Sequence, residues 1–249
     1  MQLSSYEKNI KENIIFNKAK EYKVKDSNIK YKRIPIEVVY SNRQKGQLVV
    51  ETPFLFSFGI SENKDRKTGK LVGYSIPVCL WKKDSKPDDK EKKFFDFINM
   101  LITLSKKHLD NKYEPDQIQS LSSPFYYKKI EYTDKKGKNK TKVDNSSSPI
   151  LYTKLIYSEK SKKILSLFKG KKGCDLNPLK YINQYCWVKL ALIFEGIFIS
   201  NTVTSLQIKV HECYIKDIEE PRKSLIKINE KDSDDDDDLV VEDLILSDD

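Results

Sequence analysis

A repeated alternation of apolar residues constrains the fold of this chain most strongly. Between residues 72 and 80 every second residue is apolar, in the order Val72, Tyr74, Ile76, Val78 and Leu80. Successive side chains of a β-strand point to opposite faces, so this spacing predicts a strand with one buried face. Further strands, many of them bounded by turn residues, are predicted at 32–40, 47–52, 54–60, 125–133, 149–158, 162–168, 186–194, 197–200 and 205–215.

One segment has helical spacing instead. Over residues 88–109, apolar side chains such as Phe94, Phe97 and Leu101 recur every three or four residues, behind Asp88 and Asp89 at the start. Shorter helical pieces are predicted at 6–20 and 177–183, and the polar stretch 134–148 is predicted to be a loop. Many short strands with one long helix favour a mainly β fold, either a barrel or a small sandwich with insertions.

Charge separates the end of the chain from the rest. The protein carries 46 Lys and Arg against 37 Asp and Glu, a net charge of +9, but residues 232–249 hold ten acids and no base. Residues 1–231 therefore carry 46 bases against 27 acids, or +19. Such a body attracts a polyanion. An A/T-rich genome would explain the abundance of lysine, although it would not explain the segregated tail.

The acidic tail has its own interpretation. The run Asp234, Asp235, Asp236, Asp237 and Asp238 repels itself and has nothing to bury, so it is predicted to be disordered. It is expected to compete with nucleic acid for the basic body or to dock a partner protein. A tail that only raises solubility is the alternative.

Several function classes find no support in the sequence. No apolar run approaches the ~18 residues of a membrane helix, and the first 28 residues lack the apolar centre of a signal peptide, so a soluble protein without membrane contact is expected. The four cysteines are scattered, and neither a metal nor another cofactor is expected. Phosphate-loop, dinucleotide and serine-hydrolase motifs are missing and there are only two histidines, so an enzyme is not expected.

Aromatic and basic residues alternate on the polar faces of several predicted strands. The pairs are Tyr126 with Lys128, Tyr152 with Lys154, and Trp187 with Lys189, and Lys209 lies on a similar face. Aromatic rings stack on unpaired bases while lysines neutralise phosphates, so these residues are candidates for binding single-stranded nucleic acid. Further candidates in lysine-rich loops are Lys64, Arg66, Lys67, Lys70 and Lys138. The alternatives are rings that only cover a partly buried surface and loops that are merely solvated.

The order of short sequence strings resembles that of a viral protein family. The strings are Arg33–Tyr40, Gln47–Pro53, Phe56–Gly59, the helix from Glu91, Ser148–Tyr152, Asn177–Leu179, Ala191–Ser200 and Ser205–Lys209. Together they look like the single-stranded DNA-binding proteins of nucleocytoplasmic large DNA viruses, including the African swine fever virus type. The resemblance spans residues 30 to 216 and implies an oligonucleotide/oligosaccharide-binding (OB) barrel that coats DNA during viral replication.

The sequence thus predicts an OB-fold-like barrel with one long helix, insertions and a disordered acidic C-terminal tail. Residues 1–30 would be a lead-in, 31–216 the binding domain, and 217–249 the linker and tail. The predicted function is sequence-nonspecific binding of single-stranded DNA in viral replication, repair or recombination, at a replication site in the host cytoplasm or nucleus, or in the virion. Replication proteins and a second copy of the chain are further expected partners. A scaffold protein with a DNA-facing basic surface and an RNA-binding factor are the alternatives.

Overall fold

The computed structural model describes residues 2–6, 10–23, 29–65, 67–82, 85–133, 137–144 and 147–217. Arg66 and the acidic tail, with Asp234 to Asp238, lie outside these residues. The prediction that the tail is disordered therefore concerns residues that the structure does not describe. No helix in the described ranges is both long and apolar enough to cross a membrane.

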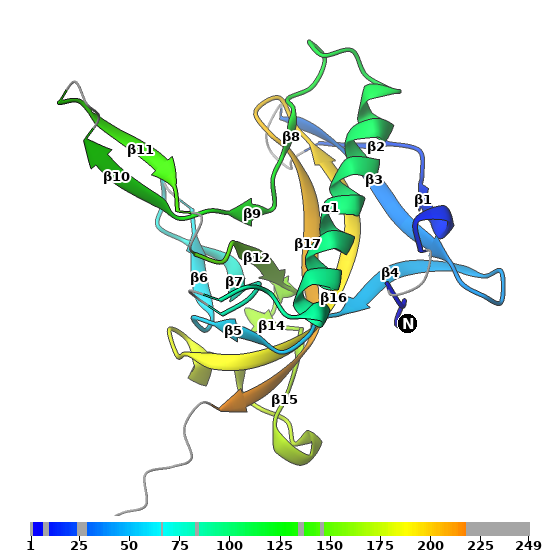
Figure 1. Cartoon of the computed structure of the whole chain (residues 1–249). Helices are drawn as coiled ribbons and strands as arrows, with labels where there is room; N and C mark the ends of the chain where they lie inside the picture. The colour runs from blue at the N-terminus through cyan, green and yellow to red at the C-terminus, as the bar shows by residue number, and fades with distance from the viewer. Residues whose placement is uncertain are drawn as a thin grey trace, which may run out of the picture. The chain divides into compact units, whose positions relative to one another are not determined.

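Five strands close into a ring (Figure 1). In order around it they are β5 (Leu55–Ser57), β7 (Leu71–Cys79), β12 (Ile150–Leu155), β17 (Thr204–Asp217) and β16 (Cys186–Ile199). Neighbours are antiparallel except β12 and β17, which are parallel, and β16 pairs back onto β5. This five-stranded ring has the connectivity of an OB barrel. The predicted mainly β fold with one long helix and an OB-like barrel is confirmed.

The alternating pattern of the sequence fills the barrel. On β16 the side chains of Val188, Leu190 and Leu192 are fully buried, and on β17 those of Ile208 and Val210 are buried as well. Burying a side chain of this size stabilises the fold by about 1.5–3 kcal/mol. The inner faces of the two longest strands thus agree with the predicted strand phase.

Four N-terminal strands extend the sheet beside β16. They are β1 (Ile14–Phe16), β2 (Lys20–Lys23), β3 (Lys30–Val39) and β4 (Lys45–Glu51). The helix predicted at 6–20 is wrong, because its range holds the short 3-10 turn η1 (Ile10–Asn13), the strand β1 and the start of β2. Pairing of β1 and β2 with β3 supplies backbone hydrogen bonds that outweigh the local helical preference.

The helix α1 (Asp89–Asp110) confirms the helix predicted at 88–109. The carboxylate of Asp88 accepts hydrogen bonds from the backbone N–H groups of Lys90 and Glu91, and the Glu91 side chain accepts one from the N–H of Asp88, which completes a capping box. The apolar side of the helix is buried, and the ring of Phe97 lies 5.4 Å from that of Phe194 on β16. The helix therefore covers part of the barrel core.

The remaining elements are short. They are β6 (Ser61–Lys64), β8 (Leu121–Ser122), β9 (Phe125–Tyr126), β10 (Lys129–Thr133), β11 (Asn139–Val143), β13 (Tyr157–Ser158), β14 (Lys163–Ile164), β15 (Leu167–Lys169), η2 (Lys171–Gly173) and η3 (Pro178–Tyr181). The helical turn predicted at 177–183 agrees with η3. The loop predicted at 134–148 is partly wrong, because β11 within it pairs with β10 and forms a hairpin that projects from the body of the fold (Figure 1).

The strands predicted at 186–194 and 197–200 are one continuous strand. Gly196 bridges them at φ +153°, within an irregularity of the pairing between β16 and β17. A Cβ atom at this position would lie 2.2 Å from the carbonyl oxygen of Ile34. The glycine therefore allows β16 to run on beside β3, where an alternating pattern alone had suggested a break.

Candidate nucleic-acid interface

The strand β12 presents an aromatic and a basic side chain on the outside of the barrel. Leu151, Thr153 and Leu155 point inward and are buried, so Tyr152 and Lys154 must point outward. The neighbouring strand β9 places Tyr126 opposite Ile150, and the rings of Tyr126 and Tyr152 meet edge to face with centroids 6.3 Å apart. Each tyrosine is 51% exposed, so both rings are accessible for stacking.

A row of outward-facing side chains crosses the barrel beside this tyrosine pair. Cross-strand pairing joins Trp187 to Phe56, Phe56 to Cys79, Cys79 to Ile150, and Ile150 to Tyr126. The row borders an apolar hollow of about 500 Å³. Its walls also include Phe58, Trp81, Lys82 and Lys128. The sequence pairs Tyr126 with Lys128, whereas the structure places Lys128 on the same hollow as Trp187.

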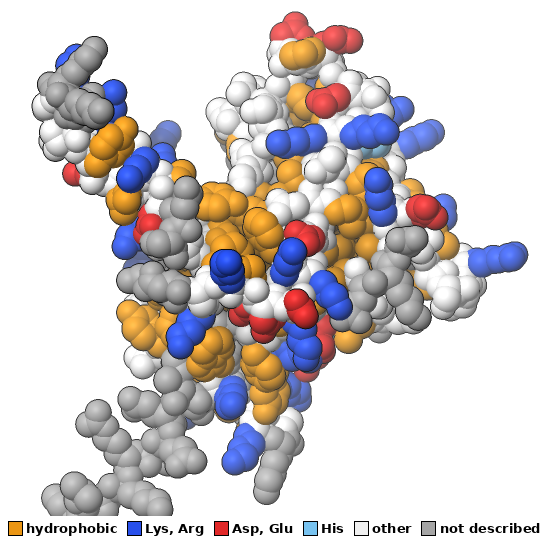
Figure 2. Space-filling view, in the orientation of Figure 1, with side chains coloured by type: hydrophobic (Ala, Val, Ile, Leu, Met, Phe, Trp, Pro, Cys, Tyr) orange, Lys and Arg blue, Asp and Glu red, His pale blue; other side chains and the backbone are white. Residues whose placement is uncertain are grey.

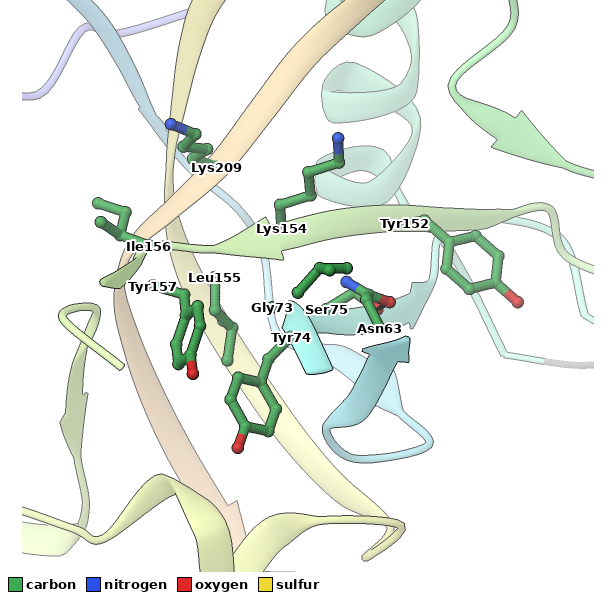
Figure 3. A pocket seen from close by; sticks show the side chains of 11 residues that line it. Asn63, Gly73, Tyr74, Ser75, Tyr152, Lys154, Leu155, Ile156, Tyr157 and Lys209 are labelled. Atoms are coloured by element: carbon green, nitrogen blue, oxygen red, sulfur yellow. Dashed lines mark hydrogen bonds between the residues drawn. The ribbon is translucent and has the colours of Figure 1, made fainter. Parts of the chain in front are cut away.

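The opposite end of β12 is basic. Figure 3 shows Tyr152 and Lys154 on β12 with Lys209 on the adjacent strand, around a second hollow of about 430 Å³. The backbone positions of Lys154 and Lys209 are partners in the parallel pairing of β12 and β17. Lys154 Nζ donates a hydrogen bond to Gln207 Oε1 at 3.4 Å, and Lys209 Nζ lies 2.8 Å from Glu195 Oε1.

Positive charge accumulates around Lys154. Partial burial lowers the pKa of Lys154, and the charges of Lys209 and Arg33 lower it further, against the opposite effect of Glu195. Like charges depress the pKa of an ammonium group because its charged form is repelled. An anion placed beside these three cations would relieve the repulsion, so this end of the surface favours phosphate.

The surface formed by Tyr126, Tyr152, Lys154, the Trp187 hollow and Lys209 is called the β12 face below. Figure 2 shows hydrophobic side chains gathered over β9 and β12, with Lys and Arg side chains along the β10–β11 hairpin beside them. The strands and pairings above account for this arrangement, because alternation on β12 and β9 directs side chains outward. Aromatic rings and cations therefore lie on one continuous surface.

The two lysine-rich segments are hairpins. At the turn between β6 and β7, Asp65 Oδ1 accepts hydrogen bonds from the backbone N–H groups of Lys67 and Thr68, which lowers the pKa of Asp65. Lys67 and Lys70 are exposed there, while Lys64 pairs with Glu62 at 2.9 Å. Lys138 is exposed near the turn of the β10–β11 hairpin. These four lysines do not line either of the two hollows described above.

Lys189 lies in a different environment from the other predicted residues. It forms an ion pair with Glu51. Together with Tyr214 and Glu212 it lines a third hollow of about 390 Å³. Trp187 pairs with Phe56 on β5, whereas Lys189 pairs with Glu51 at the end of β4, so the two outward positions belong to different hollows. This second surface is called the Lys189 face below.

Phe56 and Phe58 also line the apolar hollow, although the sequence pattern did not predict a binding role for them. In the sequence, Phe54, Phe56, Phe58 and Ile60 alternate, which predicts that they share one apolar face of a strand. This prediction is wrong, because Leu55, Ser57 and Ile60 are the buried residues, while Phe54 and Phe58 are exposed. Gly59 breaks the alternation at φ +88°, and a Cβ there would lie 2.5 Å from the backbone of Gln184. The buried Ser57 hydroxyl donates a hydrogen bond to the carbonyl oxygen of Pro77, so this polar group is tolerated on the buried face. The glycine at the end of the sequence Phe-Leu-Phe-Ser-Phe-Gly is the feature that could have indicated this change of phase.

A family model matches residues 7–241, nearly the whole chain. The chain belongs to the family described as "Protein of unknown function (DUF2738)". This membership of the DUF2738 family agrees with a single fold that runs through the described residues. None of the curated proteins matches this member of the family.

The solved structures similar to this DUF2738 protein include three of a single-stranded DNA-binding protein from bacteriophage Enc34. The complex with single-stranded DNA is 13% identical, over 75% of this chain and 93% of that one, with a TM-score of 0.40. The protein without a stated ligand is 13% identical over 88% and 98%, with a TM-score of 0.41. A C-terminal truncation is 13% identical over 74% and 91%, with a TM-score of 0.41. The resemblance to proteins of large DNA viruses stays a prediction.

Proposed function

We propose that this protein binds single-stranded DNA, without strong sequence preference, across the β12 face. The observation that carries the proposal is the exposed pair Tyr126 and Tyr152, which lies between the apolar hollow at Trp187 and the cations around Lys154. In OB barrels the second and third strands of the ring are the usual surface for oligonucleotides. β7 and β12 hold those positions here.

The chemistry of the β12 face favours unpaired bases. Rings that are half exposed offer faces and edges on which a base can stack, and each stacked base contributes ~1–3 kcal/mol. A duplex hides the faces of its bases, so it could use the lysines but not the rings. Four arginines among 46 basic residues provide few side chains for bidentate reading of base edges, which favours binding without sequence preference.

The individual roles follow from position. Tyr126 and Tyr152 would stack on two bases, and the hollow at Trp187 would take a third beside Lys128. Lys154 would neutralise the phosphate that follows, and Lys209 would contact the next one by exchanging its present partner, Glu195, for that phosphate. The hairpin residues Lys64, Lys67, Lys70 and Lys138, together with Arg66, would add phosphate contacts from the sides.

We further propose that the protein coats single-stranded DNA in the replication, repair or recombination of a large DNA virus. The sequence resemblance supports this role. The tail from Asp234 to Asp238 would compete with DNA for the β12 face or dock a replication protein, because ten acids are covalently tethered to a body of net charge +19.

A fluorescence-anisotropy titration of full-length protein with labelled oligo-dT tests the proposal. We expect binding that weakens steeply with salt, since released counterions dominate the affinity. Replacing Asp234 to Asp238 by asparagine should tighten binding if the tail competes. Competition with duplex DNA and with oligo-rU separates the alternatives. No affinity for oligo-dT at low salt would refute DNA binding, equal affinity for duplex would favour a scaffold role, and preference for oligo-rU would favour RNA.

A further inference from the structure

A second aromatic and basic cluster lies on the strands β2, β3 and β16. The rings of Tyr22 and Tyr31 stack with centroids 5.3 Å apart and planes 14° from parallel. The guanidinium carbon of Arg33 lies 5.4 Å from the centroid of Tyr31 and 5.8 Å from that of Tyr22. Phe198 on β16 continues the cluster, 5.3 Å from Tyr31.

The cluster occupies the outer side of its sheet. Register places Tyr22 opposite Tyr31, and Lys20 and Phe198 on either side of Arg33. Because these residues alternate along their strands, all five side chains share one face. Ile34 and Ile36 point the other way into the core. Among these five outward residues there are two cations and no acid, while the Glu21–Lys30 ion pair belongs to the opposite face.

Arg33 connects this cluster to the β12 face. Its charge, like that of Lys209, lowers the pKa of Lys154, so the three cations lie within electrostatic range of one another. The strands β12, β17, β16, β3 and β2 are successive neighbours in the sheet. At ~4.8 Å between strands, the surface path from β12 to β2 is roughly 19 Å. The cations Lys154, Lys209 and Arg33 lie along this path, with the Tyr126–Tyr152 pair at one end and the Tyr22–Tyr31 pair at the other.

We propose that the Tyr22–Tyr31–Arg33 cluster is a second stacking site for the same single-stranded DNA. The inference rests on the proposed function and extends it. The strand would run from the tyrosine pair on β12, with phosphates on Lys154, Lys209 and Arg33, to a base stacked on the exposed ring of Tyr22. Tyr22 is 41% exposed although it stacks on Tyr31, so one side of the ring stack remains accessible.

Two variants of full-length protein and a control test the second site with labelled dT20. Tyr22→Leu removes the ring, Tyr22→Phe keeps it, and Phe54→Leu removes a 43% exposed ring from the Lys189 face. We expect Tyr22→Leu to weaken binding roughly tenfold, as loss of one stacked base does, and the other two to change it less than twofold. The affinity of Tyr152→Ala is measured in the same assay, to show that binding depends on the β12 face.

Crosslinking adds a readout that a purely structural role for the cluster would not produce. A dT20 strand carrying 5-iododeoxyuridine is irradiated with the protein, and the modified peptides are identified by mass spectrometry. Adducts on Tyr22 or Tyr31, besides those on the β12 face, are expected. If Tyr152→Ala weakens binding, Tyr22→Leu does not, and no adducts form on Tyr22 or Tyr31, the second site alone is overturned. Absence of any binding would overturn the proposed function itself.

Discussion

The β12 face and the Lys189 face are built from the same kinds of side chain but differ in charge. Each has an aromatic pair in edge-to-face contact, Tyr126–Tyr152 at 6.3 Å and Phe54–Tyr214 at 6.0 Å. Each has a lysine beside a hollow of about 400 Å³.

The acids separate the two faces. On the β12 face Glu195 pairs with Lys209 at 2.8 Å, while Lys154 donates to the neutral Gln207 and lies near the charges of Lys209 and Arg33. Lys189 is paired with Glu51, and Glu212 lines the same hollow. A phosphate approaching Lys189 would have to replace a carboxylate, whereas near Lys154 it would relieve repulsion between cations. The surroundings of a lysine, more than its presence beside a ring, therefore decide where a polyanion binds.

The largest expected effect comes from removing the tyrosine pair. The double change Tyr126→Ala and Tyr152→Ala should weaken binding to oligo-dT by ~2–4 kcal/mol, because two stacking surfaces are lost. The double change to phenylalanine keeps both rings and should retain affinity. Anisotropy titrations at one salt concentration measure both. Phe54→Ala on the Lys189 face is the matched control, and an equal loss there would erase the distinction between the faces.

The apolar hollow should show the next largest effect. Trp187→Leu is expected to weaken binding by ~1 kcal/mol, since one stacking ring is removed while the apolar wall is retained. Oligo-dT should also quench the tryptophan fluorescence of the unaltered protein, because a base would lie against the indole. Unchanged fluorescence at saturating DNA would exclude the hollow at Trp187 from the interface.

The two lysines provide the most direct comparison. Lys154→Ala should reduce affinity about threefold to tenfold and lower the slope of log affinity against log salt by ~0.7, as loss of one phosphate contact on a single strand does. Lys189→Ala should leave the salt slope unchanged, because Glu51 already neutralises that charge. Titrations from low to moderate salt give both slopes. Equal slopes for the two variants would contradict the charge argument.

Proton linkage should give the smallest effect. The pKa of Lys154 lies below its ordinary value in the free protein, and a bound phosphate should raise it. Binding therefore takes up protons between the two pKa values, and affinity should fall as pH rises through the lower one. NMR titration of the Lys154 ammonium group, free and with oligo-dT, measures both. An unshifted pKa on binding would show that no phosphate lies beside Lys154.

Much of the fold follows from local patterns in the sequence. Alternation places Leu190, Leu192 and Val210 inside, and the capped segment from Asp88 has to be a helix because its apolar spacing matches 3.6 residues per turn. Outward directions for Tyr152 and Lys154 follow from the same alternation. The segregation of acids into the tail is likewise a property of the sequence.

Only the tertiary structure decided which of these outward residues meet. Lys154, Lys209 and Arg33 are far apart in the chain, and they converge because β12, β17, β16 and β3 are neighbours in one sheet. Lys189 follows an aromatic residue at the same spacing as Lys154 does. Its partner Glu51, however, lies far away in the sequence, on the strand β4 that pairs with β16. The phase of the Phe56 strand depends on Gly59 lying against Gln184, a contact between segments that sequence periodicity cannot contain. Local periodicity thus sets the direction of each side chain, while strand pairing over long sequence separations sets its neighbours and its charge environment.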